Sequence, residues 1–174
     1  FGAIVSAIDE GRNIYKTIKK VILYLISTSF GEVLTIAVAL ILGFPLPILA
    51  SQIIWLNFVT DGFLDVSLAM EPKEDGLLNS EFFKPKKYLL DGQMIQRMFV
   101  MAIPMMIGSL FVFQINYQLD IVKAWTMTLT VLAVFQWFNA WNCRHESKSI
   151  FQINFFSNKW LVFSTITAFV LQIL

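Results

Sequence analysis

Charged residues are scarce in this 174-residue chain. Asp, Glu, Lys and Arg together make up 14% of the sequence, against about 25% in a typical soluble domain. Apolar residues make up 57%, and the mean hydropathy is positive. The composition therefore excludes an ordinary soluble domain and indicates a membrane protein.

Cysteine and histidine each occur only once, as Cys143 and His145. A single cysteine forms neither an internal disulfide nor a CxxC metal site, so we interpret Cys143 as a packing residue. His145 and its neighbour Arg144 follow an apolar segment, where contacts with solvent or lipid headgroups are expected. The scarcity of both metal-binding residue types disfavours a site for a soft metal such as Cu(I) or zinc.

A basic leader is also missing. The chain starts with Phe1 and has no positively charged leader, so its apolar segments are not interpreted as a signal peptide. Its last apolar segment, Trp160 to Leu174, corresponds to about 22 Å of helix, against a hydrocarbon core of about 30 Å. We therefore expect the sequence to be a piece of a larger protein.

No proline occurs before Pro45, which permits a long first helix. Isoleucine recurs between Ile4 and Ile22 at helical spacing, with charged residues between, and this pattern predicts an amphipathic helix. The helix continues into residues 21–42, where Glu32 is the only charge. A helix over about residues 6–42 is roughly 55 Å long, so residues 1–20 should project from the membrane as a stalk.

Glycine and two prolines at residues 43–47 end this first helix. Further apolar segments follow, separated by polar loops at residues 71–94 and 143–158. They predict an all-α membrane protein, a bundle of about five transmembrane helices within a domain over residues 21–174. The expected spans are residues 21–42, 48–70, 95–115, 124–141 and 159–174.

The basic residues lie almost entirely on one side of this topology. The side of the stalk holds every Lys and Arg except Lys123, including the cluster Lys84, Lys86 and Lys87. By the positive-inside rule this side is cytoplasmic. We therefore expect an integral, multi-pass membrane protein in contact with the lipid bilayer, with its stalk and basic loops in the cytoplasm and without a nucleic-acid partner.

Three carboxylates interrupt the apolar spans, at Glu32, Asp61 and Asp65. Each costs about 2.5–3.5 kcal/mol at a helix centre, so acids in such positions are functional candidates. Counted from Pro45, Glu32 lies about 20 Å back and Asp61 about 24 Å forward along two antiparallel helices. The two acids are therefore level near the bilayer midplane, where the ion sites of transporters lie.

Neutral oxygens accompany these acids, because Asn57 and Thr60 lie at the same depth. Hard cations prefer carboxylate, amide and hydroxyl oxygens, so Glu32, Asn57, Thr60 and Asp61 predict a hard-cation site. Gly62 weakens the helix there, and local unwinding would release backbone carbonyls. An interhelical hydrogen-bonding role for Asn57 or Thr60 stays open.

Asp65 lies one turn beyond Asp61 on the same face. Two interpretations stay open for it. It extends an exit path for the ion, or it pairs with a basic group elsewhere in the protein.

Three stretches of the sequence resemble a known family. They are "AIDEGRNIYKTIKKVILYLISTSFGEV" (Ala7 to Val33), "PILASQIIWLNFVTDGF" (Pro47 to Phe63) and "SLAMEP" (Ser67 to Pro72). Together they resemble the carboxy-terminal transport region of type II P-type cation-transporting ATPases, most closely the calcium-pump members. Beyond Leu90 the resemblance rests on the hydrophobic pattern and on "FNAWN" (Phe138 to Asn142).

The resemblance implies roles for individual residues. The first helix corresponds to the fifth transmembrane helix of the family, and Glu32 matches its acidic ligand. Asn57, Thr60 and Asp61 match ligands of the unwound sixth helix. Ser29 stands where the reticulum calcium pump has a ligand Asn, and Gln136 where that pump has an acidic ligand; both departures favour a single-ion stoichiometry.

The resemblance also implies what lies outside this chain. The actuator, phosphorylation and nucleotide-binding domains, with ATP and Mg2+, would belong to the same polypeptide upstream of Phe1. No catalytic residue is then expected in this chain, whose part is ion translocation driven by phosphorylation elsewhere.

We expect Ca2+ as the transported cation, because two carboxylates favour a divalent ion. Three alternatives stay open. One is a sodium- or proton-pumping ATPase of the same type, and another is a gradient-driven transporter or channel that uses the same acids without ATP. The third is a scaffold subunit whose acids pair with a partner.

Overall fold

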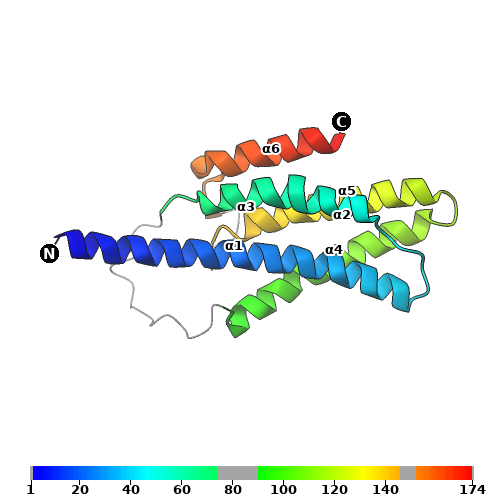
Figure 1. The fold of residues 1–174 in the computed structure, drawn as a ribbon, viewed down its shortest axis with the longest axis horizontal. Coiled ribbons are helices and arrows are strands. Elements are labelled where there is room, and N and C mark those ends of the chain that lie inside the picture. Colours follow the sequence, from blue (N-terminus) through cyan, green and yellow to red (C-terminus); the bar gives the residue numbers. More distant parts are fainter. Residues whose placement is uncertain (1, 74–89, 146–151, 174) are drawn as a thin grey trace.

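The computed structural model describes residues 2–73, 90–145 and 152–173, and its regular structure in these ranges is helical without strands (Figure 1). The prediction of an all-α protein is confirmed. In chain order the elements are α1 (Gly2–Ile41), α2 (Ala50–Trp55), the π-helix η1 (Leu56–Asp61), α3 (Gly62–Ala69), α4 (Gly92–Asn116), α5 (Ile121–Asn142), the 3-10 helix η3 (Phe155–Ser157) and α6 (Lys159–Ile173). The basic cluster at Lys84, Lys86 and Lys87 lies outside the described residues.

The first helix, α1, runs for 40 residues without a break. It ends where Gly43 adopts a φ of +76°, a conformation that costs glycine little. The amide of Phe44 donates to the Ala39 carbonyl at 2.9 Å, and that of Gly43 donates to Leu40 at 3.1 Å. This capping turn satisfies the last carbonyls of the helix, and Pro45 prevents its continuation.

Within the described residues, α1, α4 and α5 are long and apolar enough to cross a membrane, whereas α6 is a shorter apolar helix. Between them, α2, η1 and α3 follow one another directly from Ala50 to Ala69. Large apolar side chains on these helices point outward, among them Phe58 and Val33, which are 78% and 60% exposed. Such a surface is expected where helices face lipid tails rather than water.

Close packing joins α1 to α4 at Gly31. A Cβ atom added to Gly31 would lie 2.8 Å from Sδ of Met105, so only glycine fits this contact without a shift of its neighbour. Met105 is itself fully buried. Gly31 is therefore a close-packing point between the two helices.

On one side α3 packs against α1, α5 and α6. Figure 1 shows α3 between α1 and α6, with the start of α6 beside the end of α3. The core on this side is formed by buried side chains from five helices: Leu23, Tyr24, Leu64, Leu68, Met101, Ala140, Trp141 and Leu161. This arrangement brings the polar residues of η1 and α3 against α1 and α5, where the candidate site lies.

Candidate cation site

One face of α1 carries three polar residues at four-residue steps. Tyr24, Thr28 and Glu32 recur with the spacing that keeps side chains on one side of a helix. All three are buried, with Glu32 only 5% exposed. Their hydrogen bonds show that this face of α1 meets η1 and α5.

The opposing backbone is a π-helix from Leu56 to Asp61. Its wider turn is closed by Gly62, whose amide donates to the Asn57 carbonyl, five residues back. Gly62 keeps helical angles, with φ −57° and ψ −42°. The backbone therefore departs from an α-helix beside Gly62, but in this structure it widens and does not unwind. Single π-helical turns of this kind are frequent at functional sites.

Asp61 lies at the end of η1 and is 1% exposed. The Tyr24 hydroxyl donates to its Oδ1 at 2.7 Å, and the Thr28 hydroxyl donates to its Oδ2 at 3.2 Å. Neither Tyr24 nor Thr28 was expected at the site. The signal that points to them is the four-residue spacing of Tyr24, Thr28 and Glu32 along α1.

Glu32 lies one turn further along α1 and is held by amide side chains. Nε2 of Gln136 donates to its Oε1 at 2.7 Å, and Nδ2 of Asn57 approaches its Oε2 at 3.5 Å. Gln136 is fully buried, and its Oε1 has no hydrogen-bond partner among the described residues. The structure therefore brings Gln136, from α5, to the same carboxylate as Asn57, from η1.

The other predicted residues take different positions. Thr60 is 1% exposed, on the same turns of η1 as Asp61. Ser29 is exposed on α1, three residues before Glu32, and Asn57 is exposed on η1. Asp65 is partly buried in α3, and its Oδ1 is enclosed without a hydrogen-bond partner among the described residues.

The donor set of this site suits a hard cation. Glu32 and Asp61 each accept hydrogen bonds from uncharged donors, so a bound cation or a proton would offset the cost of burying their charge. No three Asp, Glu, His or Cys side chains within the described ranges gather closely enough to hold a metal by themselves. A cation here therefore needs neutral oxygens beside the two carboxylates, as hard cations accept.

Comparison with known proteins shows which family the chain resembles. Residues 45–174 match the family model described as cation transporting ATPase, C-terminus. A calcium-transporting ATPase 1 of Bacillus cereus is 33% identical over 99% of this chain, which covers 21% of that protein. A calcium-transporting ATPase type 2C member 1 of Mus musculus is 33% identical over the whole of this chain, and the match covers 19% of the mouse protein.

A further relative, the calcium-transporting ATPase of Bacillus subtilis, is 32% identical over 99% of this chain. This chain covers 20% of that relative, so it spans about a fifth of the length of the relatives that it matches. The matched family model covers most of the chain, and the relatives cover nearly all of it. The chain thus belongs to the family of cation-transporting ATPases, as a carboxy-terminal region.

Proposed function

We propose that this chain is the ion-translocation region of an ATP-driven P-type pump and that the transported cation is Ca2+. The observation that carries the proposal is the burial of Glu32 and Asp61 on facing elements, with a π-helix beside them. The names of the relatives, calcium-transporting ATPases, support the same ion. The sequence resemblance supports the coupling to ATP.

The proposed ligands are Glu32, Asn57, Thr60 and Asp61, with Gln136 as an additional oxygen donor. The side-chain oxygen of Gln136 is buried beside Glu32, so a turn of its amide presents this oxygen to a cation without moving the backbone. Asn57 is exposed but reaches Glu32 at 3.5 Å, whereas Ser29 bonds neither carboxylate among the described residues and gains no support as a ligand. Carboxylate and amide oxygens together match the preference of Ca2+.

Coupling to ATP requires a mechanical link, and α1 supplies it. The helix continues from its carboxylate, Glu32, to Gly2 as one rod of about 45 Å. In the proposed mechanism, phosphorylation of a domain upstream displaces this rod and moves Tyr24, Thr28 and Glu32 against η1. Hydrogen bonds to Asp61 then break, and the site changes its affinity and its access.

In this proposal the chain crosses the membrane several times, through α1, the run from α2 to α3, α4, α5 and α6. The distribution of Lys and Arg favours a cytoplasmic stalk over residues 1–20 and cytoplasmic loops at residues 71–94 and 143–158. The partners are the lipid bilayer and the actuator, phosphorylation and nucleotide-binding domains of the same polypeptide, where ATP and Mg2+ would bind.

Uptake of radioactive Ca2+ by vesicles that contain the full-length protein tests the proposal. We expect ATP-dependent uptake, and we expect Asp61→Asn and Glu32→Gln to abolish it. Asp120→Asn is the matched control, because Asp120 is an exposed N-cap of α5 where Asn serves equally well.

Three outcomes would contradict the proposal. Uptake that survives Asp61→Asn would contradict the site. Uptake that needs an ion gradient but no ATP would favour a gradient-driven transporter. ATP hydrolysis stimulated by Na+ or protons but not by Ca2+ would retain the pump and change its ion.

A further inference from the structure

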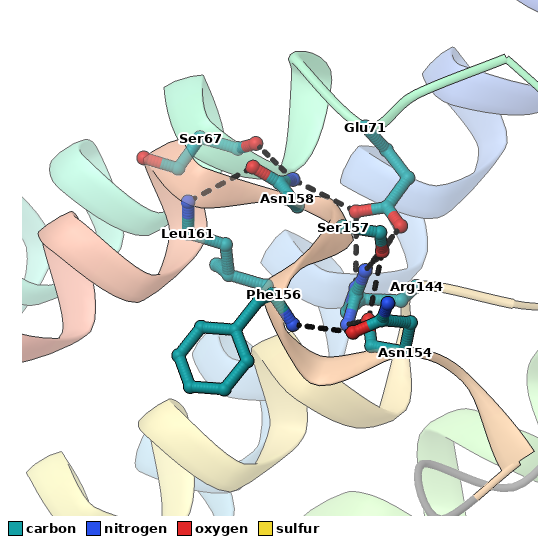
Figure 2. Close-up of polar contacts among 8 residues, drawn as sticks. All are labelled: Ser67, Glu71, Arg144, Asn154, Phe156, Ser157, Asn158 and Leu161. Atoms are coloured by element: carbon teal, nitrogen blue, oxygen red, sulfur yellow. Dashed lines mark hydrogen bonds and ion pairs between the residues drawn. The ribbon is translucent and has the colours of Figure 1, made fainter.

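A buried ion pair joins the residues that directly follow α3 and α5. Glu71 accepts hydrogen bonds from Arg144 at both carboxylate oxygens, with Nε at 3.0 Å from each and Nη2 at 2.7 Å from Oε1 (Figure 2). The side chains are 8% and 0% exposed, respectively. The expectation that Arg144 contacts solvent or headgroups is therefore wrong, because the whole guanidinium is enclosed by protein.

The segment before α6 completes the enclosure of this guanidinium. Nη2 of Arg144 also donates to the Ser157 hydroxyl at 2.5 Å, and Nη1 donates to the Asn154 carbonyl at 3.3 Å. The aromatic ring of Trp141 lies 5.1 Å below the guanidinium carbon. Arg144 thus connects α5 to η3 as well as to the end of α3.

Asn158 extends the connection to the start of α6. Its Nδ2 donates to the Ser67 carbonyl at 2.8 Å and to Glu71 Oε2 at 2.7 Å, while its Oδ1 accepts from the Leu161 amide at 3.0 Å (Figure 2). One amide side chain therefore caps α6 and holds the last turn of α3. Because it shares the carboxylate of Glu71 with Arg144, the three side chains form one network, which we call the cytoplasmic clamp: Glu71, Arg144 and Asn158.

Further contacts hold the same elements together inside the bundle. The hydroxyls of Ser67 and Ser164 form a hydrogen bond between α3 and α6. Trp141 stacks on Phe155 with centroids 4.0 Å apart, and its Nε1 donates to Thr165 at 3.1 Å. The elements α3, α5 and α6 are therefore joined at several levels by groups that carry no part of the cation site.

The hydrogen bonds that join α1 to η1 and α5 are of another kind, whereas Lys19 and Asp9 of α1 form ion pairs with Asp91 and Lys73, outside the site. Tyr24 and Thr28 donate to Asp61, and Gln136 donates to Glu32. These hydrogen bonds end on the two carboxylates that would hold the cation. Binding of a cation or proton therefore changes how α1 is attached to η1 and α5, whereas it leaves the cytoplasmic clamp intact.

We propose that Glu71 and Arg144 are positioning residues of the cation site, and this inference rests on the proposed function. By fixing the end of α3 to the end of α5, the pair sets the height of Asp61 relative to Gln136. The clamp lies about 15 Å of helix from Asp61 and about 12 Å from Gln136. The clamp thereby holds α3, α5 and α6 together as a fixed frame, and α1 moves relative to that frame.

The test uses the full-length pump in membranes and measures ATPase rate against Ca2+ concentration. We expect Arg144→Ala to raise the half-activating Ca2+ concentration several-fold, up to about 30-fold, the upper end of the coupling that residues remote from a ligand provide. Glu71→Gln and Arg144→Lys, which retain size and hydrogen bonding, should give smaller increases in the same direction. If Arg144→Ala fails to fold, these two variants decide whether the clamp positions the cation site.

Arg97→Ala is the matched control. Arg97 donates to the carbonyls of Asn142 and His145 at 3.0 and 3.1 Å, so it holds the same end of α5 from α4. We expect its half-activating Ca2+ concentration to stay within about twofold of the wild type, because Arg97 holds the end of α5 to α4 and does not set the height of α3 against α5.

A fall in maximal rate with an unchanged half-activating Ca2+ concentration in all clamp variants would overturn the inference and leave the clamp a purely structural contact. Asp61→Asn, measured in parallel, separates this failure from a failure of the proposed function. If Asp61→Asn abolishes activation by Ca2+ while the clamp variants respond normally, only the inference fails. If Asp61→Asn has no effect, the proposed function fails first.

Discussion

Tyr24 and Asp61 meet across the interface between α1 and η1, where the phenol hydroxyl lies 2.7 Å from the carboxylate. Both side chains are almost completely buried. The contact therefore provides a neutral donor to a carboxylate that has no access to water, and it belongs to the helix that we propose to move during transport.

Tyr24→Phe keeps the ring and removes this donor. Hydrogen bonds to charged groups contribute about 1.5–3 kcal/mol, so we expect a loss of this size in the free energy of unfolding without Ca2+. With saturating Ca2+ the loss should shrink, because the cation then neutralises Asp61. Thermal unfolding of the full-length protein with and without Ca2+ measures both values.

The matched control for this change is Tyr117→Phe. Tyr117 lies just after α4 and stacks on Phe113 at 5.5 Å, away from Glu32 and Asp61. Loss of the Tyr117 hydroxyl should change the free energy of unfolding equally with and without Ca2+. An equal loss for Tyr24→Phe in both conditions would argue against a contact between Tyr24 and the cation site.

Gly31→Leu should separate α1 from α4. A side chain at Gly31 would collide with Met105, and overpacking of this kind costs about 1–3 kcal/mol. Gly11→Leu is the control, since a Cβ atom at Gly11 meets nothing within 4 Å. We expect a lower melting temperature only for Gly31→Leu, with partial recovery in the double variant that also carries Met105→Ala. If the melting temperature of the double variant does not recover, the strain does not arise from the contact between residue 31 and Met105.

Cys143 should resist thiol reagents although it is the only cysteine. It is 1% exposed, just beyond the end of α5, and burial raises the pKa of its thiol to about 12 against a smaller opposing effect of Arg97. A raised pKa retains the proton, so at pH 8 the unreactive thiol predominates over the thiolate. We expect no labelling by iodoacetamide in the folded protein and full labelling in denaturant. Rapid labelling of the native protein would show that this end of α5 opens.

The network of Glu71, Arg144 and Asn158 also leads to a prediction about stability. Arg144→Ala leaves Glu71 enclosed without its partner, which costs about 3–5 kcal/mol in comparable buried pairs. Replacement of both residues, as Glu71→Leu with Arg144→Met, should cost less, because no unpaired charge remains. Thermal unfolding in detergent compares the two. Equal losses would indicate that packing, rather than the unpaired carboxylate, sets the cost.

The sequence predicted the helices and the meeting of Glu32 with Asn57, because hydrophobic length and residue counting from Pro45 fix these features locally. It did not reveal Tyr24 and Thr28 as partners of Asp61. In an apolar helix, a tyrosine and a threonine are also ordinary packing residues, and only the rotation of α1 about its axis decides which way they face. That rotation is set by contacts such as Gly31 against Met105.

The burial of Arg144 could not be predicted for a different reason. Its partner Glu71 lies 73 residues away, and its other contacts come from the segment that precedes α6. The π-helical form of η1 could not be predicted for the same reason, because the widening of the helix depends on which side chains pack around that turn. Glycine at position 62 indicates a weak point but not the direction in which the backbone departs.

The contact of Gly31 with Met105 has a mechanical consequence for α1. Gly31 lies about 43 Å of helix from Gly2 and about 10 Å from Tyr24, which lies between the two. A tilt about this fulcrum shifts Tyr24 by about a quarter of the distance travelled at Gly2. In the proposed mechanism the helix would therefore act as a reducing lever: a swing of several ångströms at Gly2 would become a displacement of an ångström or two at Tyr24, enough to break its hydrogen bond to Asp61 and small enough to leave the bundle packed.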